Sequence, residues 1–196
     1  PNGIIDTSFT ANVSGGNVFG VQALPDGKIL AAGEFNDING STRNRIARMS
    51  SGGAVDGYNP NVAGSIFGMA LQADSSVIIG GTISTVGGTA RSNVARIKSD
   101  GTLDADFNPT ITGGSTVVNG VTLQPDGKIL LAGNFTTVNG ITRNCLVQIS
   151  NVTGTQTVTT GMNAVDEVIW SITGGAPQTI EPTLEKSTNG GANWTL

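Results

Sequence analysis

The chain has 196 residues, of which 29 are Gly, one is Cys and none is His, and its formal net charge at pH 7 is −4. Without His, a His-based catalytic triad, an imidazole metal ligand and an imidazole pH switch are excluded, and the lone Cys145 cannot form an internal disulfide or a CxxC zinc site. The acidic balance and the lack of a basic run argue against nucleic acid and anionic membranes as partners, and no apolar stretch approaches the roughly 18 residues of a membrane-spanning helix.

The chain begins at Pro1 without a Met or a signal-peptide pattern and stops just after a strand-like stretch, so we expect a piece of a longer or processed chain. Its apolar residues come in runs of about five, rich in Val and Ile and separated by Gly, Asn, Asp, Ser and Thr. No window shows the 3.6-residue period of an amphipathic helix. The sequence therefore predicts an all-β chain.

A repeat of about 50 residues organises the first three quarters of the chain. We place its units at about 3–52, 53–100 and 101–150, because three sets of positions recur at the same offsets of 48 and 52 residues. These sets are the turn aspartates (Asp26, Asp74, Asp126), the strand-end glycines (Gly33, Gly81, Gly133) and the loop arginines (Arg43, Arg91, Arg143).

Each unit contains a predicted hairpin. Pro25–Lys28 and Pro125–Lys128 lie between apolar runs, and a Pro-Asp-Gly turn suits antiparallel neighbours. The middle unit has Ala73–Ser76 there, so we expect its turn to differ. The run after the turn is apolar on both faces, which predicts a strand between two packed layers. The glycine that ends it marks a close approach of neighbouring backbone.

A loop rich in Thr, Asn and Gly follows, then a short apolar strand (45–49, 93–97 and 145–149). A further recurring element contains a Gly and an Asp, in residues 3–9, 53–60 and 101–109. The whole reads as a four-stranded antiparallel unit, the size of a β-propeller blade. We therefore predict a propeller-like array, incomplete or open because it has so few units.

The stretch Pro125–Phe135 resembles the delta-60 repeat of bacterial surface and secreted proteins, a propeller-type domain of unknown function. The Asn-Gly, Arg-Asn and Asp-x-Asp-Phe-Asn-Pro motifs around it belong to the same resemblance. The resemblance covers about residues 3–150. It implies an extracellular β-propeller and no assigned catalytic residues. The middle unit departs at its turn and at Thr82-Ile83, and we expect this to loosen that blade without changing the fold.

Residues 151–196 lack the repeat and form a divergent β segment, either a fourth blade or the start of a following β domain. Strands are predicted at 167–172 and 183–187. The stretch Ser187–Trp194 resembles the Asp-box hairpin of sialidase-type propellers, with Asn189 in place of the Asp. That resemblance implies a structural turn.

The recurring charged residues have two interpretations. Arg43, Arg91 and Arg143 form either a basic ring for an acidic ligand or structural pairs that fix blade geometry, and the second is favoured because a binding site rarely needs one residue in every blade. The recurring aspartates, Asp6, Asp56 and Asp104, are assigned the same structural role. Asp104, Asp106 and Asn108 have the alternate spacing of a Ca²⁺ loop, but a plain turn is favoured because the EF-hand pattern is absent.

We therefore predict a non-catalytic extracellular structural, adhesion or interaction module, part of a larger surface or secreted protein or a polymeric assembly, with no cofactor. Its expected partners are other parts of the same polypeptide, further copies through sheet edges, and glycans. A carbohydrate-binding or glycan-cleaving propeller is the first alternative, although an aromatic content of 5% offers few platforms for sugars. A phage tail or virion component is the second.

Overall fold

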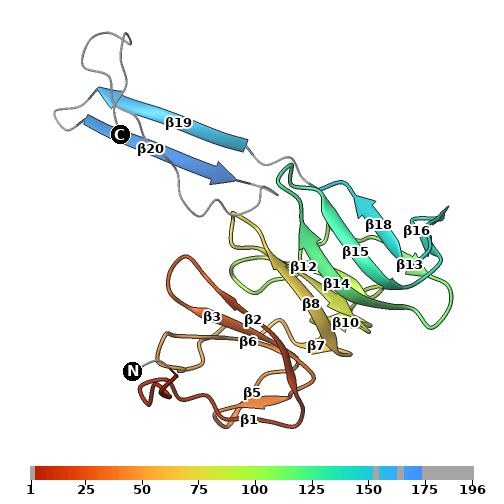
Figure 1. Cartoon of the computed structure of the whole chain (residues 1–196), viewed down its shortest axis with the longest axis horizontal. Coiled ribbons are helices and arrows are strands. Elements are labelled where there is room, and N and C mark those ends of the chain that lie inside the picture. Colours follow the sequence, from red (N-terminus) through yellow and green to blue (C-terminus); the bar gives the residue numbers. More distant parts are fainter. Residues whose placement is uncertain (1–2, 152–154, 163–165, 174–196) are drawn as a thin grey trace.

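The computed structural model describes residues 3–151, 155–162 and 166–173. Every regular element in these ranges is a β strand, which confirms the predicted all-β class (Figure 1). Accordingly, the described residues include no helix with the length and apolar character to cross a membrane.

Each of the three units builds one main antiparallel sheet from a hairpin and a third strand. In every unit the second hairpin strand is the central strand of the sheet. The strands are β2 (Val18–Ala23), β3 (Ile29–Gly33) and β6 (Ile46–Met49); β8 (Ile66–Leu71), β9 (Val77–Gly81) and β12 (Val94–Ile97); β14 (Val117–Leu123), β15 (Ile129–Asn134) and β18 (Leu146–Ile149).

Each unit also contains a small second sheet where the sequence predicts a loop. Its hairpin turns on two residues with positive φ, such as Asn39 (55°) and Gly40 (76°), which is the geometry of a type I′ turn. The strands are β1 (Val13–Ser14), β4 (Asp37–Ile38) and β5 (Ser41–Thr42); β7 (Val62–Ala63), β10 (Thr85–Val86) and β11 (Thr89–Ala90); β13 (Ile111–Thr112), β16 (Thr137–Val138) and β17 (Ile141–Thr142).

The expected four-stranded sheet is therefore corrected to two three-stranded sheets in each unit. The fourth partner at the outer edge is reduced to single bridges, Met49 with Val55 and Ile97 with Leu103. Pairing stops there because Asp56 and Asp104 turn the chain, each accepting the backbone N–H two residues further on.

The middle hairpin turn was expected to differ, and that expectation is wrong. Ser75 adopts a φ of 62°, close to the 80° of Gly27 and Gly127. Its N–H donates to the Gln72 carbonyl at 3.0 Å, just as that of Gly27 donates to Leu24. The chain thus keeps one turn type in all three units and accepts a non-Gly residue in the left-handed region in the second.

The three main sheets stack in chain order, with β8 between β2 and β14 (Figure 1). One core joins Leu30 and Ile46 of the first unit to Ile79 of the second. A second core joins Ile78 of the second unit to Leu131 of the third. Neighbouring residues of β9 therefore enter different cores, which explains why all five residues of that strand are buried.

Beyond the three units, β19 (Thr155–Met162) pairs antiparallel with β20 (Asp166–Thr173). The strand predicted at 167–172 lies within β20. The strand expected at 183–187 and the Asp-box-like stretch 187–194 lie outside the described residues.

The strand-end glycines lie against backbone. Each hairpin has a register shift at the same place, and there the Ser65 carbonyl accepts the Thr82 N–H at 2.9 Å beside Gly81. A Cβ at Gly81 would lie well inside van der Waals contact of that carbonyl oxygen, and Gly33 and Gly133 meet the Asn17 and Val117 carbonyls in the same way.

We expect Gly81→Ala to lower the free energy of unfolding by roughly 1–3 kcal/mol, because the new methyl group forces the hairpin strands apart. Urea denaturation measures this. Gly57→Ala is the matched control: no atom beyond Gly57 and its two chain neighbours lies within 4 Å of the point that its new methyl group would occupy, and its change should stay within about 0.5 kcal/mol. Equal effects of the two substitutions would contradict the steric explanation.

Candidate functional site

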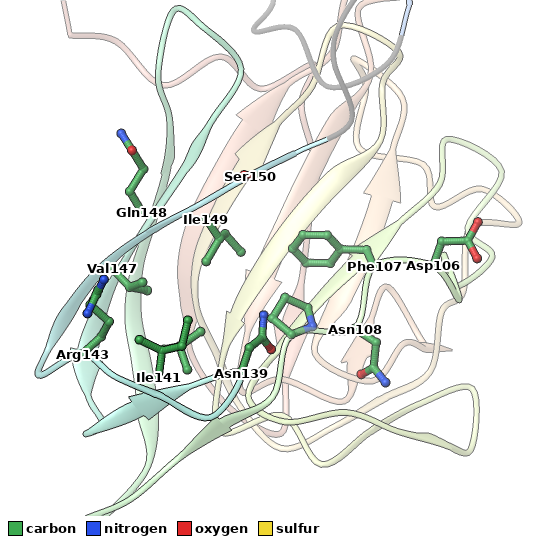
Figure 2. A pocket seen from close by; sticks show the side chains of 12 residues that line it. Asp106, Phe107, Asn108, Asn139, Ile141, Arg143, Val147, Gln148, Ile149 and Ser150 are labelled. Atoms are coloured by element: carbon green, nitrogen blue, oxygen red, sulfur yellow. The ribbon is translucent and has the colours of Figure 1, made fainter.

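A cavity of about 440 Å³ opens in the third unit, between the loop before β13 and the outer strand β18. Its apolar lining includes Phe107, Val138 and Ile149, and Figure 2 shows Phe107 and Ile149 pointing toward each other. Arg143 and Asp106 are also at the cavity, and both are exposed. The cavity thus combines an apolar interior with one cationic and one anionic side chain.

The loop arginines all bind backbone carbonyls. The Nη1 of each donates to the preceding residue's carbonyl at 2.8 Å. The Nη2 of Arg43 reaches the Asp56 carbonyl at 2.7 Å, and that of Arg91 reaches the Asp104 carbonyl at 3.2 Å. Arg143 makes no second hydrogen bond within the described ranges. Arg91 is buried, Arg43 half-buried and Arg143 exposed, so the three do not form a uniform ring.

The recurring aspartates share one local task. Oδ1 of Asp6, Asp56 and Asp104 accepts the N–H of the residue two positions later, at 2.9, 2.8 and 3.1 Å. This side-chain turn mimics a backbone turn and fixes the bend of the segment. Where the Ca²⁺ loop was considered, Oδ2 of Asp104 binds Arg96, and no three acidic, Cys or His side chains of the described residues are grouped to hold a metal.

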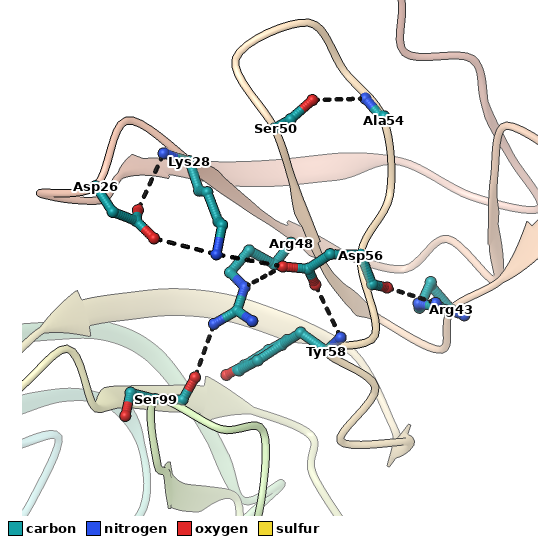
Figure 3. Close-up of polar contacts among 9 residues, drawn as sticks. All are labelled: Asp26, Lys28, Arg43, Arg48, Ser50, Ala54, Asp56, Tyr58 and Ser99. Carbon is teal, nitrogen blue, oxygen red and sulfur yellow. Dashed lines mark hydrogen bonds and ion pairs between the residues drawn. The ribbon is translucent and has the colours of Figure 1, made fainter.

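A charged clamp joins the first unit to the second (Figure 3). Nε of Arg48 lies 2.7 Å from Oδ2 of Asp56, and Nη1 donates to the Ser99 carbonyl at 2.7 Å. The guanidinium also lies 4.8 Å from the ring centroid of Tyr58. Three contacts with the second unit therefore converge on one side chain of the first.

The same clamp joins the second unit to the third. Nε of Arg96 lies 2.7 Å from Oδ2 of Asp104, its Nη1 donates to Oδ1 of Asn151 at 2.7 Å, and the ring of Phe107 lies 4.9 Å away. The third unit has Gln148 at this position, and its amide donates to Gln124 of the same unit. Within the described residues the clamp is thus present twice, and Gln148 makes a different contact at the equivalent position of the third unit.

Comparison with protein families finds a match to the domain of unknown function (DUF5122) beta-propeller at residues 24–57, 72–107 and 124–155. Each matched segment starts within one of the three units and runs a few residues past its end, and the three together span just over half of the chain. The chain belongs to this DUF5122 beta-propeller family. A search of the curated proteins finds no match.

The clamp arginines of this DUF5122 chain are not among the functional or structural residues predicted from the sequence. Arg48 and Arg96 recur at the same position of the third main-sheet strand, where the third unit has Gln148. That recurrence was the available signal, because a charged residue that returns in a mostly buried strand needs a partner. The partner itself was not visible, since Ser99 lies 51 residues beyond Arg48.

A second cavity, of about 280 Å³, lies between the first and second DUF5122 units and is lined by Arg48, Tyr58 and Ser99 among others. The Tyr58 hydroxyl is buried there and has no hydrogen-bond partner in the described part of the chain. Burial raises the pKa of Tyr58, so the phenol stays neutral. The equivalent residue of the next unit, Phe107, has no hydroxyl, so the repeat does not require this group.

Arg96→Gln gives the second unit the residue that the third unit has at the equivalent position, Gln148. We expect it to lower the free energy of unfolding by about 3 kcal/mol, because it leaves the Asp104 carboxylate half-buried without its cation. Arg143→Gln is the control, since exposed Arg143 makes only one hydrogen bond with the described residues. Urea denaturation measures the free energy of unfolding of both variants. Equal stability of the two would show that the clamp does not hold the units together.

The pKa of Asp104 is lowered from its ordinary value of 3.8. Burial alone raises this pKa, but the hydrogen bond and charge of Arg96 and the Asp106 N–H together lower it more. Because the folded pKa lies below the unfolded one, the ionised carboxylate stabilises the fold above the unfolded pKa, and this contribution is lost as the pH falls through the folded pKa.

We therefore expect the free energy of unfolding to fall as the pH is lowered below about 4, and Asp104→Asn to flatten part of that slope. Urea denaturation between about pH 2 and 6 measures it. Asp106→Asn is the control for loss of a nearby carboxylate, because the Asp106 carboxylate accepts no hydrogen bond from the described residues. If the free energy of unfolding of Asp104→Asn depends on pH as steeply as that of the wild type, Asp104 does not contribute to the loss of stability in acid.

Proposed function

We propose that this β-propeller chain is a non-catalytic structural and interaction module, built of delta-60-type units, within a larger secreted or cell-surface protein. The observation that carries the proposal is the use of the recurring charged residues. Arg48 with Asp56, and Arg96 with Asp104, hold one unit on the next. Side chains engaged in this way serve assembly and are not free to bind or activate a substrate.

The chemistry of the third-unit cavity supports a contact site more than a catalytic one. Asp106 is the one carboxylate among the described residues that line it. Glycoside hydrolysis ordinarily uses two carboxyl groups, about 5 to 9.5 Å apart on either side of the scissile bond. An apolar interior with Arg143 at its edge instead suits a peptide segment whose side chain and carbonyls are bound together.

The ends of the stack support an interaction role as well. Val21 of the first unit is 70% exposed and Leu146 of the third is 60% exposed. The residue equivalent to Leu146 in the second unit is Val94, which is fully buried between sheets. Exposed apolar side chains on sheets whose equivalents are covered mark surfaces that suit further contact. The resemblance of the repeat to delta-60 supports an extracellular location.

We expect the purified chain to release no product from a panel of chromogenic glycosides, because the described cavity offers no pair of carboxyl groups. The assay compares intact and heat-denatured protein. Turnover that Asp106→Asn abolishes would overturn the proposal in favour of a glycan-cleaving propeller. Saturable binding on a glycan array without turnover would favour the carbohydrate-binding alternative.

A further inference from the structure

The junction between the second and third units contains a side-chain carboxamide that links the two. Oδ1 of Asn151 accepts a hydrogen bond from Nη1 of Arg96 at 2.7 Å, and Nδ2 of Asn151 donates to the Gly127 carbonyl at 3.1 Å. Arg96 belongs to β12 of the second unit, and Gly127 lies in the hairpin turn of the third. One amide group therefore joins the clamp arginine of one unit to the turn of the next.

The junction between the first and second units has the same arginine and the same turn, but no such amide. Ser99 is the residue equivalent to Asn151, and Nη1 of Arg48 donates to its backbone carbonyl at 2.7 Å. Ser75 is the turn residue equivalent to Gly127, and its carbonyl accepts no hydrogen bond from the described residues. The two groups that an amide joins in the second junction are thus not joined by an amide in the first.

The cavity of about 280 Å³ lies between these groups. Its lining includes polar groups of both units and an apolar wall, namely Arg48, Ser75, Ser99, Leu24 and Leu30. Pockets that enclose drug-sized ligands measure about 300 to 1,000 Å³, so this one suits a smaller group. The first junction therefore has a small cavity bordered by the equivalents of the groups that Asn151 binds in the second.

Tyr58 brings to this cavity a hydroxyl that the second junction lacks, because the residue there is Phe107. The side chain of Tyr58 is buried, and its hydroxyl has no partner among the described residues. Figure 3 shows the ring beneath the Arg48 guanidinium, with the hydroxyl directed toward Ser99. Buried hydroxyls are ordinarily hydrogen-bonded, because an unpaired one costs free energy. A partner for this hydroxyl has to enter through the cavity.

The charged groups around the cavity are already paired. Nζ of Lys28 lies 3.2 Å from Oδ2 of Asp26 and 3.8 Å from Oδ2 of Asp56, and Nε of Arg48 lies 2.7 Å from that same Asp56 oxygen. The formal charges of these four side chains cancel. A charged ligand would lose its hydration without gaining a counter-charge, so the cavity suits a neutral group that both donates and accepts hydrogen bonds.

We propose that the first-junction cavity binds a primary carboxamide, either the side chain of an Asn or Gln in a peptide or a free small amide. The amide oxygen accepts from the Tyr58 hydroxyl and from Nη2 of Arg48, which makes no hydrogen bond with the described residues. The amide nitrogen donates to the Ser75 carbonyl, as Asn151 donates to Gly127. This inference rests on the proposed interaction function and names the chemical class of its ligand.

Titration of the isotope-labelled chain with propionamide, followed by NMR, gives the first test. We expect saturable shifts of the backbone amide signals of Ser75 and Ser99. Propionate has nearly the same shape but carries a charge, and we expect it to bind at least about tenfold more weakly. The absence of saturable shifts with propionamide would overturn the proposal, as would equal affinity for propionate.

Tyr58→Phe removes only the hydroxyl and gives the first junction the aromatic residue type of the second. We expect it to weaken propionamide binding about fivefold, because one hydrogen bond is lost. Arg143→Gln is the control, since Arg143 does not line this cavity, and its effect should stay within about twofold. If the wild type and Tyr58→Phe bind propionamide equally well, the hydroxyl does not bind the amide and the proposal fails.

Ser99→Asn supplies the first junction with a carboxamide of its own. We expect the new side chain to join Arg48 to Ser75, as Asn151 joins Arg96 to Gly127, so the urea midpoint rises and propionamide no longer binds. Ser99→Ala keeps the backbone carbonyl that Arg48 binds and should bind propionamide as the wild type does. Undiminished propionamide binding by Ser99→Asn would count against the cavity as the site.

The tripeptide Gly-Asn-Gly, with Gly-Asp-Gly as its control, distinguishes the two sources of the amide. Binding of Gly-Asn-Gly identifies a peptide side chain as the ligand, and binding of propionamide alone identifies a free amide; both results support the carboxamide site. These outcomes are separate from the glycoside assay. Failure of every amide to bind would overturn the site and leave the non-catalytic role standing, whereas glycoside turnover would refute that role and leave the site standing.

Discussion

The central strand of each unit is apolar on both faces, and the architecture depends on covering both. A strand of this kind is stable only between two layers, so one unit cannot fold its sheet into a complete core by itself. Within the stack, β9 meets the requirement with five buried residues. In β15, Leu130 and Ala132 alternate with the fully buried Ile129 and Leu131 and are more exposed, because no described unit covers that face.

The same constraint explains what the sequence could predict about the fold. Two-faced apolar runs and their turns recur along the chain, so the main hairpins and the stacked architecture were accessible. The small sheets were not, because strands of two residues carry no measurable period, although Asn39-Gly40 and Asn139-Gly140 are strong type I′ signals. The middle turn was misjudged because Ser75 tolerates a backbone conformation usually left to Gly.

The sequence predicted which residues of the candidate site recur, but not which groups they bind. Repetition located Arg43, Arg91 and the aspartates, but these arginines bind backbone carbonyls and the aspartates accept backbone N–H groups. Backbone partners leave no trace in side-chain identity. The clamp was harder still, because an Arg in a short strand resembles a solvent-facing residue until the next unit covers it. The bond from Arg96 to Asn151 spans 55 residues and exists only once the third unit is in place.

The stack has a direction, and its two ends are chemically different. At both internal junctions an Arg of the preceding unit reaches forward, Arg48 to Ser99 near the end of the second unit and Arg96 to Asn151 just after the third. Gln148 instead turns to Gln124 within its own unit. The face of the third sheet therefore lacks the group that grips a following unit, while its outer edge keeps Arg143 and the apolar cavity. Face and edge therefore carry different groups: the third unit has Gln148 where the other two have the clamp arginines, and it keeps Arg143 at its edge.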